Sequence, residues 1–416
     1  ARAMHCTRRD FLTTSAAALA AGLSPAKILR AAEEKLPPVR AITRGPKFHW
    51  FAYYDKFQFD PTDRYALGME VDFEHRSPTP ADVVKIGMID LADGDRWIEL
   101  GQTTAWCWQQ GCMLQWRPGS ADEILFNDRQ GDQYVCHILN VKTRAKRTLP
   151  HPIYAVSPDG RWAVATDFRR LGDTRPGYGY LGIPDPNTNV LAPKDSGIWR
   201  VDLETGQQKL LISLADIAKV PFPNRDLAPC KHWFNHLLVN PDGTRFEFLH
   251  RFSEPGTKRF TTRMLTAAPD GSDLRIVDTN GSTSHFIWRD PQHILSWSKQ
   301  PEAGFFVFED KTGGKVQLVG PSMPTRDGHC TYLPGNQWVL CDSYPDRDRN
   351  QNPYLYHIPT DRVVPLGHFH SPKQYAGEWR CDLHPRLSRD GRSVTIDAPH
   401  EGGRQIYLID IRGIVG

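Results

Sequence analysis

Histidines stand in four polar stretches of the second half of the chain, where they can ligate a metal or move a proton near neutral pH. The stretches are residues 231–236 with 248–251, 284–288, 326–330 and 378–386. Each of the last three comes just before a recurring turn. We therefore expect His285, His329 and His384 to take equivalent places in successive structural units and to converge.

These three histidines form, with Cys381, a predicted His₃Cys metal site. Imidazole and thiolate donors in a four-ligand set are typical of Zn²⁺. The predicted cofactor is therefore a divalent metal, Zn²⁺ rather than Mn²⁺. Asp382 replaces Cys381 if the metal is a harder ion such as Mn²⁺. The alternative is that these histidines cap strands by bonding backbone groups.

The elements that must position these residues repeat along the chain. A turn of the Pro-Asp-Gly kind followed by a strand occurs seven times, most clearly at residues 157–162 and 240–245. Pro fixes φ at the start of such a turn and Gly supplies the positive φ that closes it. An alternating strand with a polar turn, best seen at 201–206, also occurs seven times and interleaves with the first set.

A period of about 50 residues is the size of one four-stranded blade. The pattern predicts an all-β fold, a seven-bladed β-propeller formed by residues 40–416 as a single domain. The alternative is a pair of β-sandwiches. Residues 170–196 and 220–231 are rich in Pro or Gly and are predicted to be long loops over one face. Residues 211–219 form the one helical pattern after the N-terminal segment.

Composition excludes several classes of protein. The 416 residues include 33 Gly and 33 Pro without a collagen period, and 12 Trp with 11% aromatic residues argue against a mostly disordered chain. A net charge of +3 gives no reason to expect a nucleic-acid partner. The sequence has no run of 18 apolar residues, so no membrane span is predicted.

Residues 1–35 carry the pattern of a twin-arginine export signal. Arg8 and Arg9 are followed by Phe11 and by an alanine-rich stretch at 13–23. The alternative is a short amphipathic helix. The signal predicts a periplasmic or secreted protein whose partner is the twin-arginine export machinery. After Cys6 leaves with the signal, seven cysteines remain, and an odd number leaves at least one unpaired or bound to metal.

In its motifs the chain resembles the seven-bladed propeller polysaccharide lyases, namely the oligogalacturonate lyases and the related ulvan lyases. The resemblance covers most of the chain after the signal and is most specific at residues 327–329, 342–346, 380–386 and 401–405.

In oligogalacturonate lyases, a Gln-x-x-His-x-His-Pro run and an earlier His hold a metal, usually Mn²⁺. His384 matches the first His of the run and His285 looks like the earlier one. Cys381 stands at the position of the Gln, and Arg386 stands at the position of the second His. A thiolate ligand favours zinc, and in the use of zinc the chain would be similar to the ulvan lyases. A further catalytic-site His of the family looks like His250.

The resemblance implies a secreted polysaccharide lyase that cleaves an acidic, uronate-containing glycan of the oligogalacturonate or ulvan type by metal-associated β-elimination. A base removes the C5 proton, a cation neutralises the adjacent carboxylate, and an acid assists departure of the C4 oxygen. Guanidinium matches a carboxylate bidentately. The candidates are His236 or His250 as base, Arg251 or Arg263 as partner of the carboxylate, and Tyr178 or Tyr180 as acid.

The alternative function is a non-catalytic, TolB-like propeller that binds cell-envelope glycan or protein and holds no metal. The tryptophans at 106, 108 and 116 are predicted to be blade core rather than a platform for sugar rings.

Overall fold

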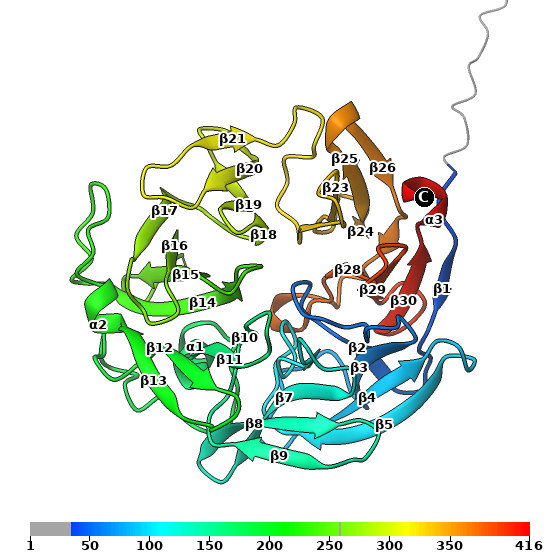
Figure 1. Ribbon diagram of the computed structural model, residues 1–416, viewed down its shortest axis with the longest axis horizontal. Coiled ribbons are helices and arrows are strands. Elements are labelled where there is room, and N and C mark those ends of the chain that lie inside the picture. Colours follow the sequence, from blue (N-terminus) through cyan, green and yellow to red (C-terminus); the bar gives the residue numbers. More distant parts are fainter. Residues whose placement is uncertain (1–34, 258) are drawn as a thin grey trace, which may run out of the picture. The chain divides into compact units, whose positions relative to one another are not determined.

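The computed structural model describes residues 35–257 and 259–416, so the predicted export signal falls outside the described part except for its last residue. In the described part, seven four-stranded antiparallel sheets stand in a ring (Figure 1). The predicted all-β, seven-bladed β-propeller is therefore confirmed. A two-stranded sheet of β24 (Asn350–Gln351) and β27 (Phe369–His370) accompanies the sixth blade.

The blades follow one another along the chain, and each is given from its first strand, which lines the channel, outward. The first four blades are β2 (Phe48–Trp50), β3 (Tyr65–Val71), β4 (Val84–Asp90) and β5 (Arg96–Thr103); β6 (Gln115–Trp116), β7 (Glu123–Gln130), β8 (Gln133–Asn140) and β9 (Lys146–Leu149); β10 (Ala155–Val156), β11 (Trp162–Thr166), β12 (Gly197–Asp202) and β13 (Gln208–Ser213); and β14 (Lys231–Val239), β15 (Phe246–Ser253), β16 (Thr261–Ala267) and β17 (Arg275–Gly281).

The last three blades complete the ring. They are β18 (Phe286–Asp290), β19 (His293–Lys299), β20 (Ala303–Glu309) and β21 (Val316–Leu318); β22 (Thr331–Tyr332), β23 (Trp338–Cys341), β25 (Tyr354–His357) and β26 (Arg362–Pro365); and β28 (Arg386–Leu387), β29 (Ser393–Ala398), β30 (Gln405–Asp410) and β1 (Val39–Ala41).

The Pro-Asp-Gly turns join the first strand of each blade to the second. In the third blade, the turn between β10 and β11 holds Gly160 at φ +67°. A Cβ atom on Gly160 would come within 2.1 Å of the Pro118 carbonyl oxygen in the corresponding turn of the second blade. Glycine is thus required by the contact between neighbouring turns as well as by the turn itself.

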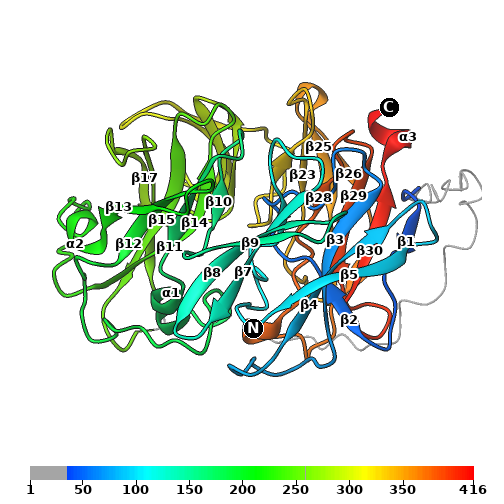
Figure 2. The ribbon, with the colours of Figure 1, turned by 60° about the horizontal axis from the view of Figure 1, so that its bottom comes forward.

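The ring is closed by a strand that the repeat did not reveal. β1 pairs antiparallel with β30, with Val39 opposite Ile409, and forms the outer strand of the last blade (Figures 1 and 2). β1 has three residues and no turn motif of its own, so the repeating pattern could not mark it. This pairing joins the start of the propeller to its end.

Helices are few and short. α1 (Phe168–Thr174), which was not predicted, begins at Asp167, whose side chain accepts hydrogen bonds from the backbone NH groups of Arg169 and Arg170. Of the predicted helix at 211–219, only α2 (Leu214–Ile217) forms, because residues 208–213 belong to β13. α3 (Arg412–Val415) and the 3₁₀ turns Ile358–Thr360 and Gly377–Trp379 complete the set within the described residues. The predicted long loops run irregularly after α1 and α2.

The three tryptophans predicted to be blade core and the seven described cysteines are all buried. Trp106, Trp108 and Trp116 are buried in one hydrophobic cluster between the first two blades, as predicted. The seven cysteines after Cys6 are all buried free thiols. Across residues 35–257 and 259–416, no helix is long and apolar enough to cross a membrane.

Candidate metal centre and active site

Four histidines from blades four to seven lie side by side. His285, His329 and His384 come directly before or within two residues of the first strands β18, β22 and β28, and His236 lies within β14. Ring centroids are 5.9 Å apart for His236 and His285, 4.1 Å for His285 and His329, and 4.3 Å for His329 and His384. The structure thus brings the three predicted metal-binding histidines together.

The donor set differs from the predicted one at two members, because it includes neither Cys381 nor His285. Ligand atoms of His329, Asp382 and His384 all lie within 4.8 Å of one another. Cys381 is not in this set. Its thiol is fully buried among Arg404, Asp397 and Glu74, and burial raises its pKa far above the usual value. Asp382, which sequence analysis offered as the replacement, takes the place of Cys381.

Two of the histidines are backed by carboxylates. His285 Nδ1 lies 2.9 Å from Asp327 Oδ1, and His329 Nδ1 lies 3.0 Å from both oxygens of Asp342. Nδ1 therefore carries the proton in each ring and donates it, and Nε2 is left with a free lone pair. This is the arrangement that orients metal-ligating histidines. Gly328 allows it, because a Cβ there would lie 2.0 Å from the Asp342 carbonyl oxygen.

The two histidines differ in how their surroundings act on the imidazole. Burial lowers the pKa of both. For His329, the charge and hydrogen bonds of Asp342, with Asp382 and Asp327 nearby, outweigh burial and raise the pKa above its ordinary value. For His285, the effect of burial exceeds that of Asp327, and the pKa falls.

His384 is held by its backbone. Its φ is +43°, in the left-handed region that a non-glycine residue rarely adopts, and such residues cluster at functional sites. Arg386 Nη1 donates to the His384 carbonyl oxygen at 2.5 Å, and Arg386 Nη2 donates to Asp397 at 2.8 Å. Neither ring nitrogen of His384 forms a hydrogen bond with any described residue. Arg386 therefore positions His384 and is not itself a ligand.

The same Asp397 supports the opposite wall. It accepts hydrogen bonds from the backbone NH groups of Phe51 and Ala52, and Ala52 has φ +80°. This bend directs Tyr53 and Tyr54 to the histidines. The Tyr53 hydroxyl lies 2.5 Å from His236 Nδ1, and the Tyr54 hydroxyl donates to the Phe286 carbonyl oxygen at 2.7 Å.

His236 occupies a β-bulge. The register of β14 against β15 shifts between Asn235 and Leu237, and His236 has φ +50°. Bulges re-aim a side chain and are frequent near active sites. Burial, followed by the charges of Arg175 and the neighbouring histidines, lowers the pKa of His236 well below its ordinary value. The neutral form of the ring is therefore favoured.

Arginines approach from the loop after α1 and from the segment before β28. Arg380 Nη2 donates to the Tyr178 hydroxyl at 2.7 Å and Arg380 Nε donates to Asp382 at 2.8 Å. The Tyr178 ring lies 5.9 Å from that of His236, and the Arg175 guanidinium lies 3.9 Å above the Tyr178 ring. Tyr178 thus connects the histidines to a group of positive charges.

Arg251 is the most unusual of these arginines. Its side chain is buried, yet Nε and Nη1 have no hydrogen-bond partner. Its guanidinium lies 4.9 Å from the Phe260 ring, and that of Arg175 lies 5.2 Å from the same ring. Arg175 Nη1 is also buried without a partner. Buried donors are paired in nearly all proteins, so these two guanidinium groups are suited to an anion.

The structure places His250 and Arg263, both predicted as catalytic, in a chain of hydrogen bonds away from the four channel histidines. Arg263 Nε donates to His250 Nδ1 at 3.0 Å, His250 Nε2 to His232 Nδ1 at 2.9 Å, and His232 Nε2 to the Leu227 carbonyl oxygen at 3.2 Å. The other Arg263 nitrogens donate to the carbonyl oxygens of residues 217, 220 and 221. All four ring nitrogens of His232 and His250 are used, and the chain of hydrogen bonds fixes the loop after α2.

Tyr180, the second tyrosine predicted as acid, lies in the hydrophobic core. Its ring stacks on Phe168 with centroids 4.2 Å apart, and its hydroxyl accepts from Asn127 Nδ2 at 2.9 Å. Burial raises the pKa of Tyr180 far above its usual value. Of the two tyrosines, only Tyr178 lies beside a site histidine.

The structure places in the site several residues to which the sequence assigned no role. They are Tyr53, Tyr54, Arg175, Asp327, Asp342 and Arg380. The signal for Asp327 and Asp342 was present, because both belong to motifs of the resemblance. Asp327 precedes His329 but serves His285 of the blade before, a cross-blade contact that neighbouring positions in sequence do not reveal.

No protein-family model matches the chain, and no curated protein matches it in sequence. Solved structures of similar fold include an oligogalacturonate lyase from Vibrio parahaemolyticus, at 14% identity and TM-score 0.64, covering 91% of this chain and 96% of that one. An oligogalacturonate lyase in complex with manganese gives 14% identity and TM-score 0.65, covering 90% and 93%. TolB from Acinetobacter baumannii gives 12% identity and TM-score 0.40 over 74% and 65%. The chain thus has the seven-bladed fold of the two lyases.

Proposed function

We propose that this protein is a polysaccharide lyase that cleaves a uronate-containing glycan by β-elimination with a divalent metal. One observation carries the proposal: a group within metal-sharing reach, His329, His384 and Asp382, lies close to arginines with unpartnered nitrogens. Tyr178 lies between the two, because it bonds Arg380, which bonds Asp382, and it packs under Arg175, which shares the Phe260 ring with Arg251. Cation, neutral base and anion-binding arginines are what elimination next to a carboxylate requires.

The donor set fits a divalent cation. His329 and His384 would hold it with Asp382, and His285, with its free Nε2, is the adjacent donor. The bound cation would neutralise the uronate carboxylate and so acidify the neighbouring C5–H bond. With Asp382 in place of the thiolate, the donors no longer favour Zn²⁺ over Mn²⁺, since imidazole and carboxylate groups bind either ion. The manganese complex of a lyase with the same fold makes Mn²⁺ the first ion to test.

The protein's own groups would move the protons. His236, kept neutral by burial, accepts the C5 proton at a ring nitrogen. The electron pair of that C–H bond forms the C4–C5 double bond, and the C4–O bond breaks. The Tyr178 hydroxyl already accepts a bond from Arg380, so its own proton is free to be donated to the departing oxygen. Arg251 and Arg175 would orient a carboxylate of the chain.

The substrate is proposed to be an acidic oligosaccharide or polysaccharide, with oligogalacturonate first and an ulvan-type glycan second. The two lyases of similar fold support the first choice. A periplasmic or secreted location, reached through the twin-arginine machinery, is the accompanying proposal and is supported by Arg8 and Arg9 with the alanine-rich stretch that follows.

The decisive experiment is an incubation of the purified protein with polygalacturonate, glucuronan and ulvan, in the presence of Mn²⁺ or Zn²⁺ or a chelator. The expected result is a rise in ultraviolet absorbance from an unsaturated uronate on at least one glycan, abolished by the chelator. No product from any acidic glycan with either metal would reject the lyase assignment. Binding of a glycan without product would favour the non-catalytic alternative.

A matched pair of tyrosines tests the assignment of roles. Tyr178→Phe removes the proposed proton donor and is expected to lower kcat about 100-fold. Tyr180→Phe removes a hydroxyl that only accepts a bond from Asn127 in the core, and kcat is expected to stay within about twofold of wild type. Equal losses in the two variants would contradict the role of Tyr178.

A further inference from the structure

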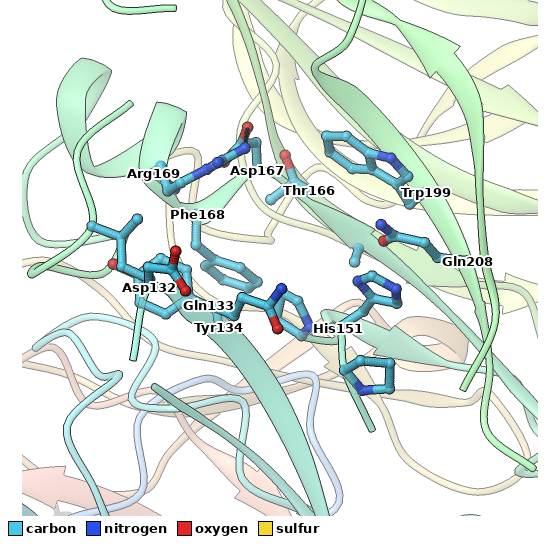
Figure 3. Close-up of a pocket in the computed structure, with 14 residues that line it drawn as sticks. Asp132, Gln133, Tyr134, His151, Thr166, Asp167, Phe168, Arg169, Trp199 and Gln208 are labelled. Carbon is cyan, nitrogen blue, oxygen red and sulfur yellow. Dashed lines mark hydrogen bonds and ion pairs between the residues drawn. The ribbon is translucent and has the colours of Figure 1, made fainter. Parts of the chain in front are cut away.

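A separate cavity of about 220 Å³ lies between the second and third blades. None of the histidines, arginines or tyrosines of the proposed active site lines it. Its walls come from β8, the segment that follows β9, the end of β11 with the start of α1, and the outer strands β12 and β13 (Figure 3). It is smaller than the roughly 300–1,000 Å³ of pockets for drug-sized ligands, so it admits one ring-sized group.

Aromatic side chains form part of this wall. Tyr134 and Phe168 are buried, whereas Trp199 is only partly buried and lines the cavity near Gln208 (Figure 3). The register of β12 against β13 shifts between Ile198 and Trp199. Such a shift re-aims the side chain that follows it. An indole at a cavity wall offers an apolar face on which a sugar ring can stack.

Several polar side chains of the cavity are free to bond a ligand. Tyr134 is 7% exposed, and its buried hydroxyl has no side-chain partner, so that the backbone NH of Ile183 is the one protein group that reaches it. The exposed side chains of Asp132, Gln133 and Gln208 and the half-buried His151 form no hydrogen bond with any described residue. Buried hydroxyls are paired as a rule. A buried hydroxyl whose own proton has no acceptor, next to amide and carboxylate groups that face solvent, is therefore suited to a ligand that carries several hydroxyls.

The charge of the cavity differs from that of the active site. Arg169, its one arginine, donates from Nε and Nη2 to the two oxygens of Asp167 at 2.9 Å each, and that ion pair is internal. Burial lowers the pKa of His151, which favours its neutral form. The remaining charge on the wall is the carboxylate of Asp132. A uronate would be repelled, and a neutral ring would be accepted.

We propose that the cavity between the second and third blades binds a neutral pyranose unit of a glycan chain. One face of the sugar stacks on Trp199, and its hydroxyls bond Tyr134, Gln133 and Gln208. The site goes beyond the lyase chemistry: it holds an uncharged part of a glycan while the arginines and histidines act on a charged part. Its test measures binding, so its outcome is independent of whether elimination occurs.

The test is calorimetric titration of the full chain with cellotriose and xylotriose, and with trigalacturonate as the anionic comparison. Saturable binding of a neutral trisaccharide is expected. Trp199→Ala is expected to weaken it about tenfold. Tyr134→Phe is expected to weaken it about fivefold with little change in melting temperature, because the lost hydroxyl has no side-chain partner in the free protein.

Three results would overturn the proposal: neither neutral trisaccharide binds saturably, both variants bind it as wild type does, or trigalacturonate binds in a way that Trp199→Ala abolishes. Tyr134→Phe keeps the ring that fills the core, so a loss of affinity in that variant cannot be ascribed to misfolding. Neutral-sugar binding in a protein without lyase activity would leave this site standing and reject the proposed function alone.

Discussion

The propeller holds a channel group of buried histidines and a pair of buried histidines in the fourth blade, and the two differ in the hydrogen bonds of their ring nitrogens. In the channel group, His285 and His329 use Nδ1 on a carboxylate, and His384 uses neither nitrogen. In the fourth blade, His232 and His250 use all four nitrogens on each other, on Arg263 and on a carbonyl oxygen. Residue type and burial are the same in both groups.

The comparison shows that burial alone does not identify a functional histidine. A neutral imidazole has one donor and one acceptor nitrogen, and a ligand to a metal needs the acceptor free. The channel group keeps this acceptor free and supplies Asp327, Asp342 and Asp382 around it. The pair in the fourth blade has no acceptor left, so its contribution is to the stability of the fold.

The largest effect is expected from removing a channel histidine. His384→Ala should lose the bound metal and lower the rate of elimination at least about 1,000-fold, since one proposed metal ligand is removed. Elemental analysis of the purified variant and the ultraviolet assay measure both. His357→Ala, on β25, the third strand of the sixth blade, is the control and should keep wild-type metal content. Full metal content in His384→Ala would contradict the ligand assignment.

The second effect is the converse, a loss of stability without loss of metal. His250→Phe keeps the volume but leaves Arg263 Nε and His232 Nδ1 without partners. The free energy of unfolding should fall by about 3 kcal/mol, because two buried polar groups lose their hydrogen bond. Urea denaturation measures this, and metal content should equal wild type. A variant that folds stably but has lost its metal would show that the two groups are not distinct.

These differences explain what the sequence could and could not predict. The seven turns and interleaved strands follow from Pro and Gly positions, which act locally, and they placed His285, His329 and His384 in equivalent positions. The closure by β1 and the choice of Asp382 over Cys381 depend on contacts between distant segments. Local pattern likewise could not separate His250 from His236, since their hydrogen-bond partners lie on other strands and loops.

The third effect concerns neighbouring residues that point into different surroundings. Asp382→Asn should weaken metal binding about 100-fold, because a charged donor is replaced by a neutral amide. Cys381→Ser, one residue away, should leave the metal affinity unchanged, since that thiol lies among Arg404, Asp397 and Glu74. Competition with a chromogenic chelator gives both affinities. A larger loss in Cys381→Ser would restore the predicted thiolate ligand.

The smallest effect is a difference in acid stability. Burial lowers the pKa of His232 from 6.5 to about 4. The unfolded chain therefore binds this proton first, so the stabilisation is complete above pH 6.5 and is lost as the pH falls towards 4.

In His232→Gln, the amide can still accept from His250 and donate to Leu227 but does not titrate. Relative to wild type, the variant should gain about 1–2 kcal/mol in unfolding free energy on going from pH 7.5 to pH 5. Urea unfolding at the two pH values measures this, and the carboxylates common to both proteins cancel in the comparison. An equal difference between variant and wild type at both pH values would mean that His232 is not held neutral by the fold, and the contrast between the two histidine groups would then rest on hydrogen bonds alone.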